Sequence, residues 1–198
     1  MNMFKRSANE LKSIQCLAVT GVLVAIYVVM NAYIAVNTEV LKITFGFLAL
    51  ATIGMLYGPV VAMIAAIPCD IITALLAGMG INFAFTPVKI IEGFIYGIFL
   101  YGFAKNHKIN FILQGLRILI PRLLVVLVCH VILNSLLIYF IILSADAREN
   151  LNFGAFLTPR LSKNAVQFPI DVLLMWIVLP VAGLAYKKSF KKQEREHD

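Results

Sequence analysis

The sequence is poor in charge, in cysteine and in the motifs of catalysis. Only 14% of its 198 residues are charged and 61% are hydrophobic, which excludes an ordinary soluble domain. Its three cysteines, Cys16, Cys69 and Cys129, lie in apolar segments without CxxC or Cys/His spacing, so no disulfide framework or metal site is expected. No Walker motif is present, and no Ser or Cys lies in a nucleophile motif. We therefore expect a membrane protein that is not an enzyme and has no cofactor of its own.

The few charges are unevenly distributed along the chain. The net charge is +7, and most of the surplus lies in residues 1–12, 105–108 and 187–198. Basic tails and loops of this kind are typical of the cytoplasmic side of a multi-pass membrane protein rather than of a nucleic-acid-binding face. The pattern predicts that both termini are cytoplasmic. It also predicts that the chain is surrounded by membrane lipid and that nucleic acid is not a partner.

Long apolar runs predict an all-α integral membrane protein with six transmembrane helices. A crossing needs about 20 apolar residues, and turn signals divide the runs. We expect one membrane domain, 1–198, with cytoplasmic tails 1–12 and 187–198. Five or seven crossings would put the two basic tails on opposite faces. The expected spans are roughly 13–36, 42–56, 59–77, 87–105, 123–143 and 158–186.

Particular residues predict where the fifth and sixth spans begin. Arg117, Pro121 and Arg122 favour an interfacial segment over 111–122, before the fifth span. Residues 144–157 are expected to form an outer loop. Thr158 and Pro159 then suit the cap and first turn of the last helix, because proline lacks the N–H that has no helical partner there.

The last span carries the most unusual pattern, a polar stripe within an apolar helix. At about 100° per residue, Arg160, Lys163, Asn164, Gln167 and Asp171 fall on one side. Pro169 should kink the helix beside a cavity. A stripe three turns deep favours a binding site. The alternative is that Arg160 and Lys163 extend to the membrane surface as snorkelling side chains.

Other charges within the apolar runs are also candidates for the site, because charge at depth is costly. Lys89 and Glu92 are one turn apart and either neutralise one another or face a ligand. Asp70 either braces a neighbouring helix or contacts a ligand, and Lys42 precedes the second span. Further candidates are aromatic residues near outward loop ends, which would otherwise belong to the aromatic belt of the membrane interface. They are Phe45, Phe47, Phe83, Phe85, Phe153 and Phe156, of which Phe45 and Phe85 are chosen for the site.

Three segments resemble the substrate-binding S components of energy-coupling factor (ECF) vitamin transporters, most of all the folate branch. They are LKITFGFLALATIGMLYGPVVA, EGFIYGIFLYG and LTPRLSKNAVQFPIDVLL. The resemblance implies six membrane helices and a vitamin site on the outward side, closed by loops. It also implies that the chain docks on a transmembrane coupling protein and two ABC ATPases, which use the ATP.

The resemblance also suggests a role for the first span. Gly21-x-x-x-Ala25 presents two small residues on one face, which by spacing alone serves packing within the chain or docking of a partner. S components carry an Ala-x-x-x-Ala face there that meets the coupling protein. Gly21 and Ala25 occupy the matching positions.

Folate would need a slot for its pteridine ring and cations for its glutamate carboxylates. Asn164, Gln167 and Asp70 are expected to read the ring edge. Carboxylates would be held by Arg160, Lys163 and Lys42.

One feature departs from the folate pattern: Glu92 stands where that branch tends to place arginine. The sequence therefore leaves open a related pterin or another vitamin. Outside this family, the alternatives are a membrane enzyme acting on lipid or isoprenoid and a structural membrane protein. The first lacks a paired carboxylate or a metal-binding spacing.

Overall fold

The computed structural model describes residues 3–34, 36–37, 42–76, 83–103, 111–143 and 152–196. The described chain is helical apart from one antiparallel ladder, β1 (Val36–Asn37) with β2 (Lys42–Ile43). Two of its helical segments, η2 and η3, are π-helical. The helices are α1 (Met3–Glu10), α2 (Ile14–Ala32), α3 (Phe47–Tyr57), α4 (Pro59–Leu76), α5 (Thr86–Leu100), α6 (Phe111–Leu124), η2 (Val125–Leu133), α7 (Asn134–Leu137), η3 (Ile138–Ile142) and α9 (Phe153–Glu196).

Four helices in the described part of the chain are long and apolar enough to cross a membrane. They cover Ile14–Ala32, Pro59–Leu76, Leu113–Ile141 and Phe153–Ser189. The other two expected spans are short: α3 has 11 residues and α5 has 15. The structure therefore supports an all-helical membrane protein. In its described part, four of the six expected crossings are helices long and apolar enough to span a membrane.

Two expected helix boundaries were wrong. The expected fifth span begins at 113 or earlier instead of at 123. Helix α6 runs into η2 without a break, so residues 111–122 form no separate interfacial segment. Pro121 lies inside α6. Arg122 is 2% exposed, because it pairs with groups on other helices instead of reaching the surface.

The last helix also begins earlier than the sequence suggested. It starts at Phe153, so Thr158 and Pro159 lie within α9 rather than at its cap and first turn. The Thr158 hydroxyl donates to the Gly154 carbonyl at 2.9 Å, one turn back along the helix. Helix α9 continues through Pro169, as expected, and on into the basic C-terminal segment.

Helix α3 is the centre of the molecule. Ten of its 11 residues are buried, and it contacts α2, α4, α5 and α9. Two of its neighbours, α4 and α5, approach each other closely at glycines of α5. A Cβ on Gly93 would lie 2.7 Å from the Ala62 carbonyl oxygen, and a Cβ on Gly97 would overlap the backbone of Pro59. Backbone-to-backbone packing of this kind is typical of membrane helices. It makes α3, α4 and α5 one tightly packed unit.

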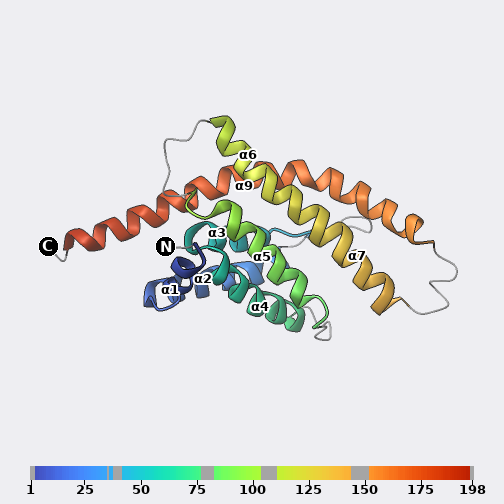
Figure 1. The fold of residues 1–198 in the computed structure, drawn as a ribbon, viewed down its shortest axis with the longest axis horizontal. Helices are drawn as coiled ribbons and strands as arrows, with labels where there is room; N and C mark the ends of the chain where they lie inside the picture. Colours follow the sequence, from blue (N-terminus) through green and yellow to red (C-terminus); the bar gives the residue numbers. More distant parts are fainter. Residues whose placement is uncertain are drawn as a thin grey trace.

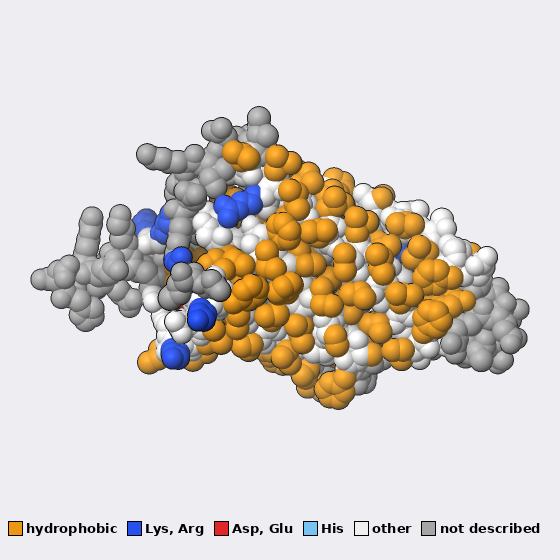
Figure 2. Space-filling model, viewed as in Figure 1, with side chains coloured by type: hydrophobic (Ala, Val, Ile, Leu, Met, Phe, Trp, Pro, Cys, Tyr) orange, Lys and Arg blue, Asp and Glu red, His pale blue; other side chains and the backbone are white. Residues whose placement is uncertain are grey.

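The C-terminal helices lie along this unit. Figure 1 shows α9 running the length of the molecule beside the run from α6 to α7, with α1 to α5 gathered on one side of them. Figure 2 shows hydrophobic side chains over most of the same face, and Lys and Arg gathered near the end where both termini lie. Exposed apolar residues also occur along α9, for example Ile177 (58%) and Val181 (60%). A lipid-facing belt with a basic end has this appearance.

Candidate functional site

Two adjoining cavities lie between the α2–α5 unit and the C-terminal helices. We name them the Glu92 cavity, of about 190 Å³, and the Arg160 cavity, of about 430 Å³. Four residues line both: Lys89, His130, Lys163 and Asn164. The Glu92 cavity is also lined by Tyr27, Asn31, Thr44, Phe47, Glu92, Arg122 and Gln167. The Arg160 cavity is also lined by Asp70, Phe85, Asn134, Ile138 and Arg160.

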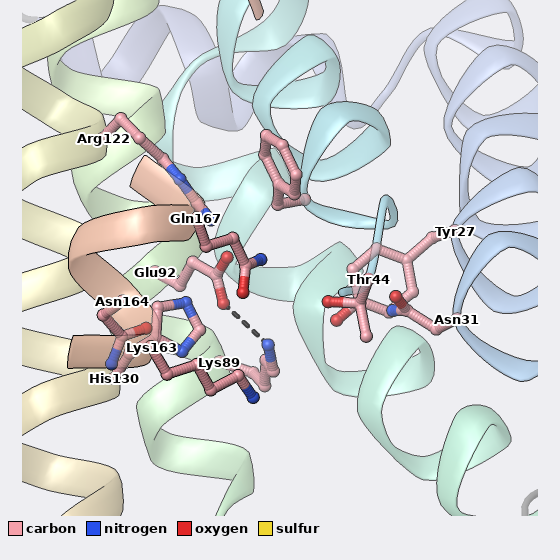
Figure 3. A pocket seen from close by; sticks show the side chains of 11 residues that line it. Tyr27, Asn31, Thr44, Lys89, Glu92, Arg122, His130, Lys163, Asn164 and Gln167 are labelled. Carbon is pink, nitrogen blue, oxygen red and sulfur yellow. Dashed lines mark hydrogen bonds and ion pairs between the residues drawn. The ribbon is translucent and has the colours of Figure 1, made fainter. Parts of the chain in front are cut away.

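An ion pair on α5 forms part of the wall of the Glu92 cavity. Lys89 and Glu92 are three residues apart on α5, and the Lys89 Nζ lies 2.8 Å from a Glu92 carboxylate oxygen. Glu92 is only 1% exposed, whereas a quarter of the Lys89 side chain is accessible. Figure 3 shows the side chains of Lys163 and His130 beside this pair, and those of Thr44, Asn31 and Tyr27 on the opposite side of the cavity. A buried carboxylate is thus available in the cavity wall, with its charge balanced by a more exposed cation.

Helix α9 brings four of the predicted stripe residues to the cavities. Lys163 and Asn164 line both, Gln167 lines the Glu92 cavity, and Arg160 lines the Arg160 cavity. The Arg160 guanidinium carbon lies 4.4 Å from the centre of the Phe156 ring, one turn earlier. This cation–π contact places the guanidinium against the Phe156 ring, beside the cavity that Arg160 lines.

The fifth stripe residue, Asp171, has a different place. Its carboxylate accepts a hydrogen bond from Arg122 at 2.5 Å, and both side chains are buried. Arg122 also donates to the Tyr96 hydroxyl at 2.7 Å and lies over the Phe47 ring, 4.0 Å from its centre. Asp171 therefore joins helices at the end of the Glu92 cavity instead of lining it.

Four further predicted residues have different outcomes. Asp70 and Phe85 line the Arg160 cavity, and the Asp70 carboxylate accepts a hydrogen bond from Thr86 at 2.8 Å. Asp70 thus both braces α5 and faces the cavity. Phe45 packs against the apolar core and lines neither cavity. The side chain of Lys42 lies outside the described part of the structure.

Several cavity residues were not predicted from the sequence. Tyr27 and Asn31 come from α2, Thr44 precedes α3, and His130 comes from η2. Phe47, one of the candidate aromatic residues, also lines the Glu92 cavity. His130 and Asn134 are four residues apart, a pair that the sequence offers for catalysis without a partner acid, and both line the Arg160 cavity instead. The others are ordinary interior side chains whose place depends on how the helices pack.

The predicted docking face on α2 is accessible. Gly21 and Ala25 are both exposed, and a Cβ on Gly21 would meet no atom within 4 Å. The stripe around them is also exposed, with Val22 at 60% and Val29 at 47%. These small residues therefore do not serve close packing inside the described part of this chain.

Known protein sequences match this chain over most of its length. The family model described as "ECF-type riboflavin transporter, S component" matches residues 11–188. A folate transporter FolT of Leuconostoc mesenteroides is 31% identical over 160 residues, covering 80% of this chain and 81% of the relative. A FolT of Clostridium novyi is 26% identical over 167 residues, covering 84% and 88%.

A solved structure agrees with these sequence matches. The crystal structure of a FolT bound with folic acid superposes with a TM-score of 0.67 at 30% identity. The match covers 83% of this chain and 92% of that chain. Fold and sequence thus lead to the same group of proteins.

Proposed function

Because this chain belongs to the S components of ECF-type transporters, we propose that it is the substrate-binding subunit of a folate importer and has no catalytic activity. It captures folate from the outer face of the cell membrane, with its pteridine ring in the Glu92 cavity and its glutamate tail in the Arg160 cavity. Uptake then requires a transmembrane coupling protein and two ABC ATPases that hydrolyse ATP. Helices α3 and α5 complete six crossings in this arrangement.

The observation that carries the choice of ligand is the surplus of cations around the cavities. Four basic side chains, Lys89, Arg122, Arg160 and Lys163, line the two cavities against two acidic ones, Glu92 and Asp70. An anionic ligand tail gains charge-assisted hydrogen bonds from basic groups of this kind. The family description names riboflavin, but riboflavin carries no carboxylate that Arg160 and Lys163 could bind. Folate carries two carboxylates at one end.

Glu92 can bind the other end of folate, the pteridine ring. The 2-amino-4-oxo edge of a pteridine presents adjacent N–H donors, and a buried carboxylate accepts two such bonds at once. Asn164 and Gln167 offer further donors and acceptors in the same cavity. Glutamate where the folate branch tends to have arginine is therefore compatible with a pteridine. The two cavity volumes together also fall within the roughly 300–1,000 Å³ of small-molecule sites.

Binding of folic acid by the purified chain tests this proposal directly. We expect a 1:1 complex in calorimetric titration in detergent, and a similar one with 5-formyl folate. Riboflavin should give no measurable heat, because it lacks the anionic tail that Arg160 and Lys163 would hold. Tight binding of riboflavin without binding of either folate would refute the assignment.

Orientation in the membrane is a second testable part of the proposal. Both termini and His107 should be cytoplasmic and Arg148 external, because the basic segments 1–12, 105–108 and 187–198 then share one side. In intact cells, a cysteine placed at position 148 should react with a membrane-impermeant reagent, and one at position 107 should not. The reverse labelling pattern would overturn the six-span arrangement.

A further inference from the structure

We propose that Arg122 is a positioning residue for ring recognition. Its guanidinium fixes the Phe47 ring in the wall of the Glu92 cavity, and Phe47 in turn holds the flat part of the ligand opposite Glu92. This inference rests on the proposed function, because it assumes that the cavity receives a planar heteroaromatic ring. It assigns a role to a buried cation whose two terminal nitrogens already donate to Tyr96 and Asp171.

The geometry around Arg122 joins four helices. From α6, its two terminal nitrogens donate to the Tyr96 hydroxyl on α5 at 2.7 Å and to the Asp171 carboxylate on α9 at 2.5 Å. Its guanidinium carbon lies 4.0 Å from the centre of the Phe47 ring at the start of α3. Arg122, Asp171 and Tyr96 are at most 2% exposed. The guanidinium is therefore held in one orientation by groups that are themselves fixed.

Energetics argue that this arrangement serves more than stability. Taking an arginine and an aspartate out of water costs several kcal/mol per ion, and apolar residues of similar volume often stabilise as well or better. A planar guanidinium, however, can donate along its edges while its face covers an aromatic ring. Of the groups around Arg122, Phe47 lines the Glu92 cavity. The buried Arg122 therefore fixes the Phe47 ring in the wall of the cavity.

A fixed wall affects binding because it lowers the cost of ordering the site. An aromatic side chain recognises a flat ring best at a defined stacking angle and distance. If Phe47 were free to change rotamer, part of the binding free energy would be lost in ordering it. The ring part of the ligand should feel this loss, and the tail beside Arg160 and Lys163 should not.

Arg117 provides a matched control on the same helix. It donates from Nε to the Phe99 carbonyl at 3.2 Å and from Nη2 to the Tyr101 carbonyl at 3.3 Å. It therefore also ties α6 to the α5 region, but it lines neither cavity. Loss of Arg117 should lower stability without changing ligand recognition.

The experiment uses the full chain in detergent and three probes. They are folic acid, pteroic acid, which lacks the glutamate, and p-aminobenzoylglutamate, which lacks the pteridine. In Arg122→Lys, affinity for folic acid and pteroic acid should fall about 10-fold each, which is the order of the cost of immobilising one side chain on binding. Affinity for p-aminobenzoylglutamate should not change. Arg117→Gln should leave all three affinities unchanged while lowering the melting temperature.

A double-substitution cycle tests whether Arg122 acts through Phe47. Phe47→Leu should weaken pteroic acid on its own, and adding Arg122→Lys should then have no further effect. Equal losses for all three probes, additive effects in the cycle, or unchanged affinity in Arg122→Lys would each overturn the inference. If Arg122→Lys does not fold, an unchanged affinity for pteroic acid in Phe47→Leu overturns it instead. Wild-type protein that binds neither folic acid nor pteroic acid would refute the proposed function itself.

Discussion

Replacing Arg160 and Lys163 together by glutamine is expected to weaken folic acid binding by about two to four orders of magnitude. Each charge-assisted hydrogen bond to a desolvated carboxylate contributes roughly 1.5–3 kcal/mol, and ~1.4 kcal/mol corresponds to a factor of ten. Arg160 lines the Arg160 cavity and Lys163 lines both cavities, so both can reach the tail of one ligand. Calorimetric titration of the purified double variant measures the loss.

The same variant should bind pteroic acid nearly as well as wild type, because this ligand lacks the glutamate carboxylates. Changes at Asn164 or Gln167, by contrast, should weaken both ligands alike, since both share the ring. Lys188→Gln is the control: it removes an exposed cation from the distal part of the same helix. If Arg160 and Lys163 only reach the membrane surface, the double variant will change expression or stability and keep its affinity for folic acid.

Bulky residues on the exposed face of α2 should abolish folate uptake while leaving folate binding intact. Gly21 and Ala25 are exposed, and a side chain at Gly21 meets open space, so Gly21→Trp or Ala25→Trp should not disturb the fold of the isolated chain. A coupling protein that packs closely on small residues would be excluded by an indole ring. Uptake by cells that express the whole transporter should fall to background, while titration of the purified subunit should give the wild-type affinity.

The matched control for this prediction is Val181→Trp. Val181 is 60% exposed on α9, so the substitution adds the same bulk to a different apolar surface. It should reduce neither binding nor uptake. Parallel loss of binding and uptake in Ala25→Trp would show that α2 supports the fold of this chain rather than a docking interface.

Local patterns in the sequence were sufficient for several features of the site. The Lys89–Glu92 pair follows from a spacing of three residues, which places two side chains on one helix face. The stripe of α9 follows from helical periodicity in the same way, and four of its five members line the cavities. In both cases the relevant geometry lies within one helix. Side chains related by helical spacing keep that relation wherever the helix packs.

Boundaries and partners could not be obtained in this way. Arg122 was predicted to be interfacial because arginine next to proline is typical of a helix end, yet its partner Asp171 is 49 residues away along the chain. That pairing exists only because α6 and α9 pack together. The early start of α9 at Phe153 likewise depends on contacts outside the segment, since the Phe153 and Phe156 rings pack against Tyr139.

The sequence by itself determined that this is a membrane protein, because apolar runs and basic tails report the membrane environment along the whole chain. Its family was indicated by the resemblance of three segments to S components. Only the tertiary structure decided which polar groups face one another. It brought Tyr27, Phe47 and His130 to the same cavity as Glu92, and it placed Asp171 on Arg122. The physical reason is that a polar side chain inside a membrane protein must find its partner on whichever helix packs beside it, and no local spacing encodes that neighbour.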